Sequence, residues 1–403
     1  MIAFDPTDDQ KLMQETVASF AKTLRARLRE TEKERAVAPD LRKTAHELGL
    51  GMVAVPEALG GAGLGLLTAA LLEEELAYGD PAAPFGFGGP GALGAAVAEL
   101  GTAEQAKALL APFAGADAWD RFGAVAWGEK KASSQRAGLT TVAVNRMGTW
   151  ELTGEKAYVV NADRASSFVV FAQTSEGQGW NGIGAFIVKK GTPGLTVLPR
   201  ETSLGLDAAS FGGIKLDGVE VDESDRLAGA PDFDAALVRF FAKQSLVTAA
   251  RALGLARAAF DIALEYCEQR RAFGKPIGHF QAVAFTLADR AMDVDAARGL
   301  VWRAAHAWDS GAPEKDALLY SARAASFALE AAMRCGDDAV QLHGGAGFMR
   351  DYAVEKLMRD AKQLQVCTMT AEHCDQLAAA IELGRAYDPG DVLPTAESQS
   401  AFV

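Results

Sequence analysis

The architecture of this chain is most directly inferred from one segment, Tyr266-Cys-Glu-Gln-Arg270-Arg-Ala-Phe273-Gly274-Lys-Pro-Ile277-Gly-His-Phe280-Gln281. Before it, apolar residues recur at the spacing of one helical stripe, at Leu253, Phe260, Leu264 and Cys267. After it, helical periodicity resumes and continues from Phe280 to Ser310. The segment therefore joins two long helices.

The chain divides into a helical first part, a β-rich middle and a helical last part. Short β-type runs, separated by Gly, Asn and Ser turns typical of antiparallel strands, extend from Phe122 to Leu227. Helical periodicity returns at Asp232 and includes Lys315–Cys335 and Thr370–Gly384. We therefore predict an α+β, mainly α fold, with a β-barrel inserted before a C-terminal four-helix bundle. The expected parts are an N-terminal helical domain (1–120), a central β-domain (121–230), the helical bundle (231–388) and a polar tail (389–403).

Composition narrows the class of protein. The 403 residues include 40 Lys+Arg and 53 Asp+Glu, a net charge of −13, which argues against nucleic-acid or anionic-membrane partners. Four cysteines without a C-x-x-C pair indicate neither a disulfide framework nor a metal site. The beginning of the sequence lacks a secretion-signal pattern, and no apolar stretch is long enough to span a bilayer. A soluble, cytoplasmic protein is therefore expected.

Residues 266–281 resemble the Y-x-x-x-R-x-x-F-G-x-x-I-x-x-F-Q signature of the acyl-CoA dehydrogenases. Two further stretches are similar to the family's Q-x-x-G-G-x-G and RDAK motifs: Gln341-Leu-His-Gly344-Gly345-Ala-Gly347 and Arg359-Asp-Ala-Lys362. Val55-Pro-Glu57 and Glu74-Glu-Leu76 are similar to its N-terminal pattern. The resemblance covers nearly the whole chain, from Asp8 to about Gly384.

This resemblance implies a three-domain fold, FAD held between subunits, and α,β-dehydrogenation of an acyl-CoA thioester. It also implies an electron-transfer flavoprotein or similar acceptor, and a homo-oligomer, either a dimer or the usual homotetramer. The planar guanidinium of Arg270 suits the FAD pyrophosphate, and Gln341 with Gly344 and Gly345 allows close approach to the adenosine end. The other cofactor-binding positions that the resemblance implies are Phe273, Gln281, Thr370, Tyr158, Val160, Trp127 and Ser134.

The carboxylate that removes the substrate α-proton is missing from both positions where the family carries it. Thr368 occupies the usual position after the RDAK run, and a hydroxyl is no general base for this proton. Gln244 occupies the alternative position on the long helix before Arg270. Glu372 and His373 are candidate substitutes, although Glu372 is also typical of a charge at a helix N-terminus and His373 of an ordinary first-turn residue.

Further departures cluster around the expected flavin. The family's Thr and Trp align with Val160 and Tyr158, and Arg251 replaces a Gly. In the loop that the family writes T-E-P-x-x-G-S-D, only Glu129 and Ser134 are kept. Several changes around one reaction centre indicate altered or absent dehydrogenation.

Three hypotheses follow from these departures. The chain is an FAD-dependent dehydrogenase with a displaced base, or it is the base-less subunit of a heterotetramer whose second dehydrogenase subunit supplies the Glu. The third is a different flavin reaction on the same fold, such as hydroxylation or desulfination. A purely structural role is disfavoured because the segment around Arg270 is intact.

Overall fold

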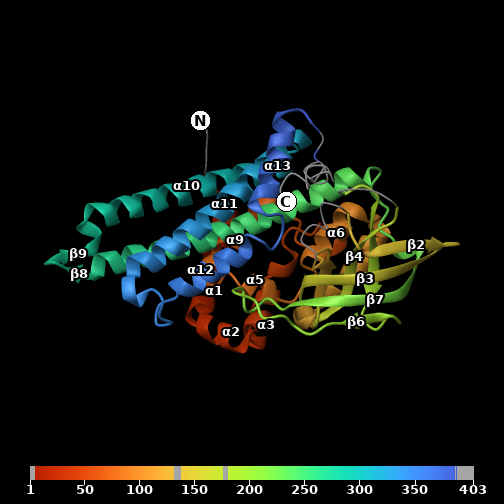
Figure 1. Ribbon diagram of the computed structural model, residues 1–403, viewed down its shortest axis with the longest axis horizontal. Helices are drawn as coiled ribbons and strands as arrows, with labels where there is room; N and C mark the ends of the chain where they lie inside the picture. Colours follow the sequence, from red (N-terminus) through yellow and green to blue (C-terminus); the bar gives the residue numbers. More distant parts are fainter. Residues whose placement is uncertain (1–4, 131–137, 176–179, 386, 388–403) are drawn as a thin grey trace, which may run out of the picture.

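The structure is a computed structural model that describes residues 5–130, 138–175, 180–385 and 387 of the chain. Long helices α9, α10 and α11 run side by side and form one half of the molecule, and the β-sheet lies at the other end (Figure 1). The N-terminal helices pack between them, chiefly through contacts of α4 with α9. The α+β, mainly α class that the sequence predicts is confirmed.

The N-terminal part is helical, as expected. Its first helix starts at a capping box, in which Thr7 and Gln10 bond each other's backbone N–H groups, and it ends at Ala26, so the helical pattern that continues along the sequence belongs to a second helix. The α-helices are α1 (Asp8–Ala26), α2 (Leu28–Glu34), α3 (Pro39–Glu47), α4 (Gly65–Gly79), α5 (Ala83–Gly86), α6 (Ala92–Leu100) and α7 (Ala103–Leu110). Short 3-10 helices are η1 (Leu50–Met52), η2 (Glu57–Leu59), η3 (Ala111–Phe113) and η4 (Ala118–Asp120).

The sheet is mixed, and the expectation of antiparallel strands throughout was wrong. Strand β4 pairs in parallel with β1 and β2. Along the sequence, the β2–β3 hairpin separates β1 from β4, so these two strands are not joined by the tight turn that antiparallel neighbours need. The path is β1-β4-β2-β3-β7-β6, with β5 paired to β4. The strands are β1 (Phe122–Ala126), β2 (Val142–Arg146), β3 (Thr149–Val160), β4 (Ala165–Gln173), β5 (Ile183–Lys189), β6 (Leu195–Val197) and β7 (Phe211–Asp222).

The C-terminal part is a helical bundle that also contains one further helix, α12, and a short β-hairpin, β8–β9, which the periodicity did not predict. The helices are η5 (Glu223–Asp225), α9 (Phe233–Gln269), η6 (Ile277–His279), α10 (Gln281–Asp309), α11 (Glu314–His343), η7 (Gly344–Ala346), α12 (Val354–Leu364) and α13 (Ala371–Glu382), and β8 (Arg271–Ala272) pairs with β9 (Lys275–Pro276). Helix α11 continues eight residues beyond the predicted end at Cys335, so Gln341 is helical. Helix α12 contains the RDAK run. The described helices include none that is both long and apolar enough to cross a membrane.

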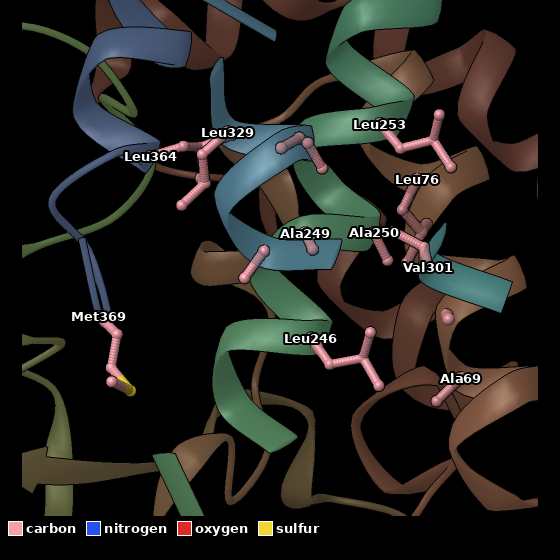
Figure 2. Close-up of a cluster of buried hydrophobic side chains, with 14 of the residues drawn as sticks. Ala69, Leu76, Leu246, Ala249, Ala250, Leu253, Val301, Leu329, Leu364 and Met369 are labelled. Carbon is pink, nitrogen blue, oxygen red and sulfur yellow. The ribbon is translucent and has the colours of Figure 1, made fainter. Parts of the chain in front are cut away.

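Buried apolar side chains of α4, α9, α10, α11 and α12 gather in one part of the core (Figure 2). Leu246, Ala249 and Leu253 of α9 are almost fully buried there. Helices α4 and α9 touch at Gly254, where an added Cβ would lie 2.1 Å from the Glu74 carbonyl oxygen. This close contact fixes α4 against α9, the helix that also carries Gln244, one of the two positions where the base is expected.

Candidate functional site

Both positions expected for the base lie together in the structure. The hydroxyl oxygen of Thr368 is 2.8 Å from that of Thr248, which bonds the backbone oxygen of Gln244 at 3.0 Å. Thr248 is buried and Thr368 half-buried. The structure therefore unites the two predicted positions through Thr248, a residue that the sequence reasoning missed. Its signal was its spacing of four residues from Gln244, which places both on one face of α9.

Arg251 continues this polar face of α9, three residues after Thr248. Its guanidinium makes two bonds to the Glu73 carboxylate of α4, at 2.7 and 2.9 Å, and lies 4.4 Å from the centre of the Phe85 ring. Both charged side chains are mostly buried. The arginine that replaces the family's glycine is thus neutralised by a carboxylate from another helix.

The two candidate substitute bases, Glu372 and His373, both lie in the first turn of α13. Glu372 is exposed, and bonds from the Thr370 side chain and its own backbone N–H lower the pKa of its carboxyl. Thr370 caps α13, and its hydroxyl lies 3.3 Å from the backbone N of His373 and 3.2 Å from the ring Nδ1. Burial raises the pKa of the neighbouring Cys367 thiol to about 12, so it is a protonated thiol at neutral pH. Both substitutes behave as first-turn helix residues.

The sheet brings its predicted flavin positions to the same end of α9. Trp127, directly after β1, makes an edge contact with Phe241, with ring centres 4.7 Å apart. Phe241 precedes Gln244 by three residues on α9. Val160 is half-buried against the core, whereas Tyr158 is 59% exposed and has a positive φ of 57°. Ser134 lies outside the described residues.

A buried ion pair fixes this edge of the sheet. The Lys156 Nζ lies 2.9 Å from Glu129 Oε1 and 3.1 Å from the Trp127 carbonyl oxygen, and both charged side chains are almost fully buried. Burial acts against the Glu129 carboxylate, but the Lys156 charge and the bonds donated by Thr140 and Thr141 outweigh it and lower the pKa of Glu129 to about 2. Glu129, a residue that the family loop also carries, therefore holds the backbone of Trp127 in place through Lys156.

The remaining predicted cofactor residues lie at the opposite end of α9. Arg270 caps the helix and, within the described part of the chain, has neither a hydrogen bond nor an ion pair through its side chain. Phe273 is 96% exposed on the β8–β9 hairpin. Gln281, the first residue of α10, and Gln341, near the end of α11, are also exposed. Gly344 has a positive φ of 54°, and an added Cβ would meet nothing within 4 Å there or at Gly345.

The two groups of residues are separated by most of the length of α9. Arg270 follows Gln244 by 26 residues, which is about 39 Å at the helical rise. The β8–β9 hairpin accordingly forms the far tip of the molecule, away from the sheet (Figure 1). One dinucleotide cannot touch both groups within one chain. The residues fit FAD only if the Arg270 end of one chain meets the Thr368 end of another.

The exposed Arg270 guanidinium, which has no partner among the described residues, together with the exposed Phe273 ring and the open turn at Gly344, suits a phosphate-bearing nucleotide that a second chain helps to enclose. The polar face of α9 near the sheet suits the end of that nucleotide where chemistry occurs. This fold and these two groups of residues define an oxidoreductase of the acyl-CoA dehydrogenase class.

Comparisons with known proteins agree with this class. The N-terminal, middle and C-terminal domains of acyl-CoA dehydrogenases match residues 7–117, 124–219 and 233–380. The chain is 34% identical over 372 residues to the probable acyl-CoA dehydrogenase YngJ of Bacillus subtilis, covering 92% of this chain and 96% of that protein. The chain belongs to the acyl-CoA dehydrogenase family.

Solved structures give the same result. Butyryl-CoA dehydrogenase from Megasphaera elsdenii superimposes with a TM-score of 0.84 and 30% identity, over 95% of this chain and 100% of that one. The FAD complex of PigA superimposes with a TM-score of 0.86 and 25% identity, over 95% and 99% of the two chains.

Proposed function

We propose that this chain is an FAD-dependent oxidoreductase that acts on an acyl-CoA thioester, and that it works as one subunit of a heteromeric dehydrogenase whose partner supplies the base. The observation that carries the proposal is the pair of hydroxyls, Thr368 and Thr248, at the position where the family has a carboxylate. A threonine hydroxyl does not accept the α-proton of a thioester at neutral pH. The same chain keeps the exposed Arg270 that a nucleotide would need.

When bound, FAD supplies hydride acceptance from the β-carbon of the substrate. Arg270 would hold its pyrophosphate, with Gln341 and Gly344 near the adenosine end. Tyr158 and Val160 would face the flavin from the sheet, close to Trp127. The lone pairs of the Thr368 hydroxyl can accept a hydrogen bond from a donor group of the substrate, which orients the substrate without removing its α-proton.

The length of α9 supports assembly from more than one chain. A complete site needs the Arg270 end of one subunit beside the Thr368 end of another, so a monomer has two half-sites. In a heterotetramer, this chain would supply Arg270 to a site whose base comes from the second dehydrogenase subunit. An electron-transfer flavoprotein or a similar protein would accept the electrons. The fold and the family are equally compatible with a homotetramer, which the experiment below separates from the heteromer.

The experiment is to purify the chain alone, saturate it with FAD and add butyryl-CoA and longer acyl-CoAs without oxygen. The visible spectrum reports both steps, since bound flavin absorbs near 450 nm and bleaches on reduction. We expect bound flavin that no acyl-CoA bleaches, and bleaching after the second dehydrogenase subunit is co-expressed. Bleaching in the isolated chain would contradict the heteromer, and failure to bind FAD would contradict the proposal as a whole.

A different flavin reaction is the second candidate, because hydroxylation or desulfination does not need an α-proton base. The likeness to PigA, whose solved complexes contain FAD and proline, favours it. Product analysis under air separates the two candidates: an enoyl-CoA supports dehydrogenation, whereas oxygen incorporated into the substrate, or sulfite release, supports the alternative.

A further inference from the structure

We propose that a pocket between the N-terminal helices and the sheet is a second anion site, which binds the phosphate group of a small molecule. The pocket has a volume of about 300 Å³ and is lined by Ala36, Arg42, Asp120, Phe122 and Arg164. These residues come from α3, the segment before it, the end of η4, the start of β1 and the turn between β3 and β4. Neither the base positions nor the Arg270 segment contributes to it.

Two guanidiniums share one aromatic ring in this pocket. The Cζ atoms of Arg42 and Arg164 lie 6.0 and 5.6 Å from the centre of the Phe122 ring, and Arg42 is 5.0 Å from that of Trp119. Aromatic faces position guanidinium groups without using their N–H donors. The donors of both arginines can therefore face the same bound group.

The two arginines differ in how their charges are compensated. Arg42 forms an ion pair with Asp120. Arg164, by contrast, has no hydrogen bond and no ion pair within the residues that the structure describes, although it is half-buried. Burial lowers the pKa of Arg164, and the charge of Arg42 lowers it further, whereas the charges of Asp163 and Asp120 oppose this shift. Among the described residues that line the pocket, Arg164 is thus a partly buried cation without a hydrogen-bond acceptor.

A third arginine adds positive charge behind the pocket. Within the part of the chain that the structure describes, Arg200 donates to backbone oxygens alone, those of Arg35, Asp207 and Ala209, and to no carboxylate. Its pKa is lowered by burial and then by the charges of Arg35 and Arg164. Of the acidic groups around it, Asp207 is already paired with Arg359.

The charged groups that face the pocket therefore do not balance. Of the residues that line it, Arg42 and Arg164 stand against Asp120 alone, in a chain whose net charge is −13. Outside the lining, the charges of Arg35 and Arg200 are opposed by those of Asp163 and Asp207. A local excess of guanidinium groups in an acidic protein attracts an anion to that point. Phosphate oxygens match the fork of two guanidinium N–H groups and would supply the negative counter-charge that Arg164 is missing.

The test is calorimetric titration of the FAD-saturated full chain with sodium pyrophosphate at low salt, so that the proposed cofactor site is already filled. The variants are Arg164→Gln, which removes the charge, and Arg164→Lys, which keeps the charge but loses the fork. Arg146→Gln makes the same charge change on the exposed β2–β3 hairpin and is the matched control.

We expect one pyrophosphate site per chain, with affinity about tenfold weaker in Arg164→Gln, an intermediate loss in Arg164→Lys, and affinity within about twofold of the unsubstituted chain in the control. Inorganic phosphate should compete for the site, and succinate should not. No saturable binding, equal binding by both Arg164 variants and the unsubstituted chain, or succinate binding as tight as pyrophosphate would each overturn the proposal. If Arg164→Gln does not fold, the pyrophosphate affinity of Arg164→Lys is compared with that of the Arg146→Gln control, and a weaker affinity in Arg164→Lys supports the proposal. None of these outcomes depends on acyl-CoA oxidation.

Discussion

The Thr368 hydroxyl, between α12 and α13, lies 2.8 Å from the Thr248 hydroxyl on α9. Because Thr248 donates its own proton to the Gln244 backbone oxygen, Thr368 must be the donor to Thr248. This chain of hydrogen bonds ends at the Gln244 backbone carbonyl, which is too weakly basic to take up a proton at neutral pH. At the position of the family's base, the chain thus has a closed set of hydrogen bonds rather than a proton acceptor.

Replacing Thr368 with Glu should create or raise dehydrogenase activity, because it restores a carboxylate at this point. General-base catalysis is worth about 10²- to 10⁴-fold, so we expect Thr368→Glu to bleach bound flavin with an acyl-CoA at least about 100-fold faster than Thr368→Gln. Stopped-flow absorbance without oxygen measures both rates. Equal rates with FAD still bound would mean that the pocket has diverged beyond this residue.

Replacing Glu129 with Gln should destabilise the fold by about 3 kcal/mol, because it leaves the buried Lys156 ammonium without its counter-charge. Urea unfolding at pH 7 measures the change in free energy. Glu155→Gln is the control, since Glu155 is an exposed residue of β3, the strand that carries Lys156, and lies 3.6 Å from Lys130. The control should change stability by less than about 0.5 kcal/mol, and an equal effect of the two substitutions would contradict the prediction.

The Glu129 carboxylate should also contribute to acid unfolding. Its pKa in the fold is about 2, below the ordinary value of 4.5, so its contribution is fully present above about pH 4.5 and is lost as the pH falls toward 2. The contribution amounts to about 3 kcal/mol. The stability difference between the unsubstituted chain and Glu129→Gln should therefore shrink when unfolding is measured at pH 6 and then at pH 3. A difference that does not change with pH would rule out this linkage.

The fold class and the approximate positions of the long helices could be predicted, because long apolar stripes and glycine turns are local signals. The parallel pairing of β1 with β4 could not, since β1 pairs across an inserted hairpin and nothing in its own five residues specifies a distant partner. The base positions were predicted singly from the family pattern. Their union through Thr248 depends on how α9 meets the turn after α12, which is a tertiary contact without a local signal.

Substituting Gly254→Ala should destabilise the chain by about 1–3 kcal/mol, because the new methyl group would meet the Glu74 carbonyl of α4 at 2.1 Å. Gly299→Ala is the matched control in α10, where an added Cβ meets nothing within 4 Å. Greater helix propensity should make that control more stable by up to about 1 kcal/mol. Thermal unfolding of the two variants should therefore shift in opposite directions. Shifts in the same direction would contradict the close packing of α4 on α9.

Substituting Arg270→Ala should weaken FAD binding by about tenfold or more without lowering the unfolding temperature of the flavin-free chain. The physical reason is that this side chain is exposed and bonds no other described residue. Flavin fluorescence titration and calorimetry measure the two quantities. Arg271→Ala is the neighbouring control and should bind FAD as before. A loss of stability in Arg270→Ala would show that the arginine has a structural role instead.

The 26-residue separation of Gln244 and Arg270 along α9 has a genetic consequence. In a homotetramer of this chain, a damaging change at the hairpin end and one at the sheet end would fall in different half-sites when two mutant chains assemble together. Mixed oligomers would then contain some sites made entirely of undamaged ends. Two alleles that are each inactive alone would partly restore function when expressed together, whereas two alleles damaged at the same end would not.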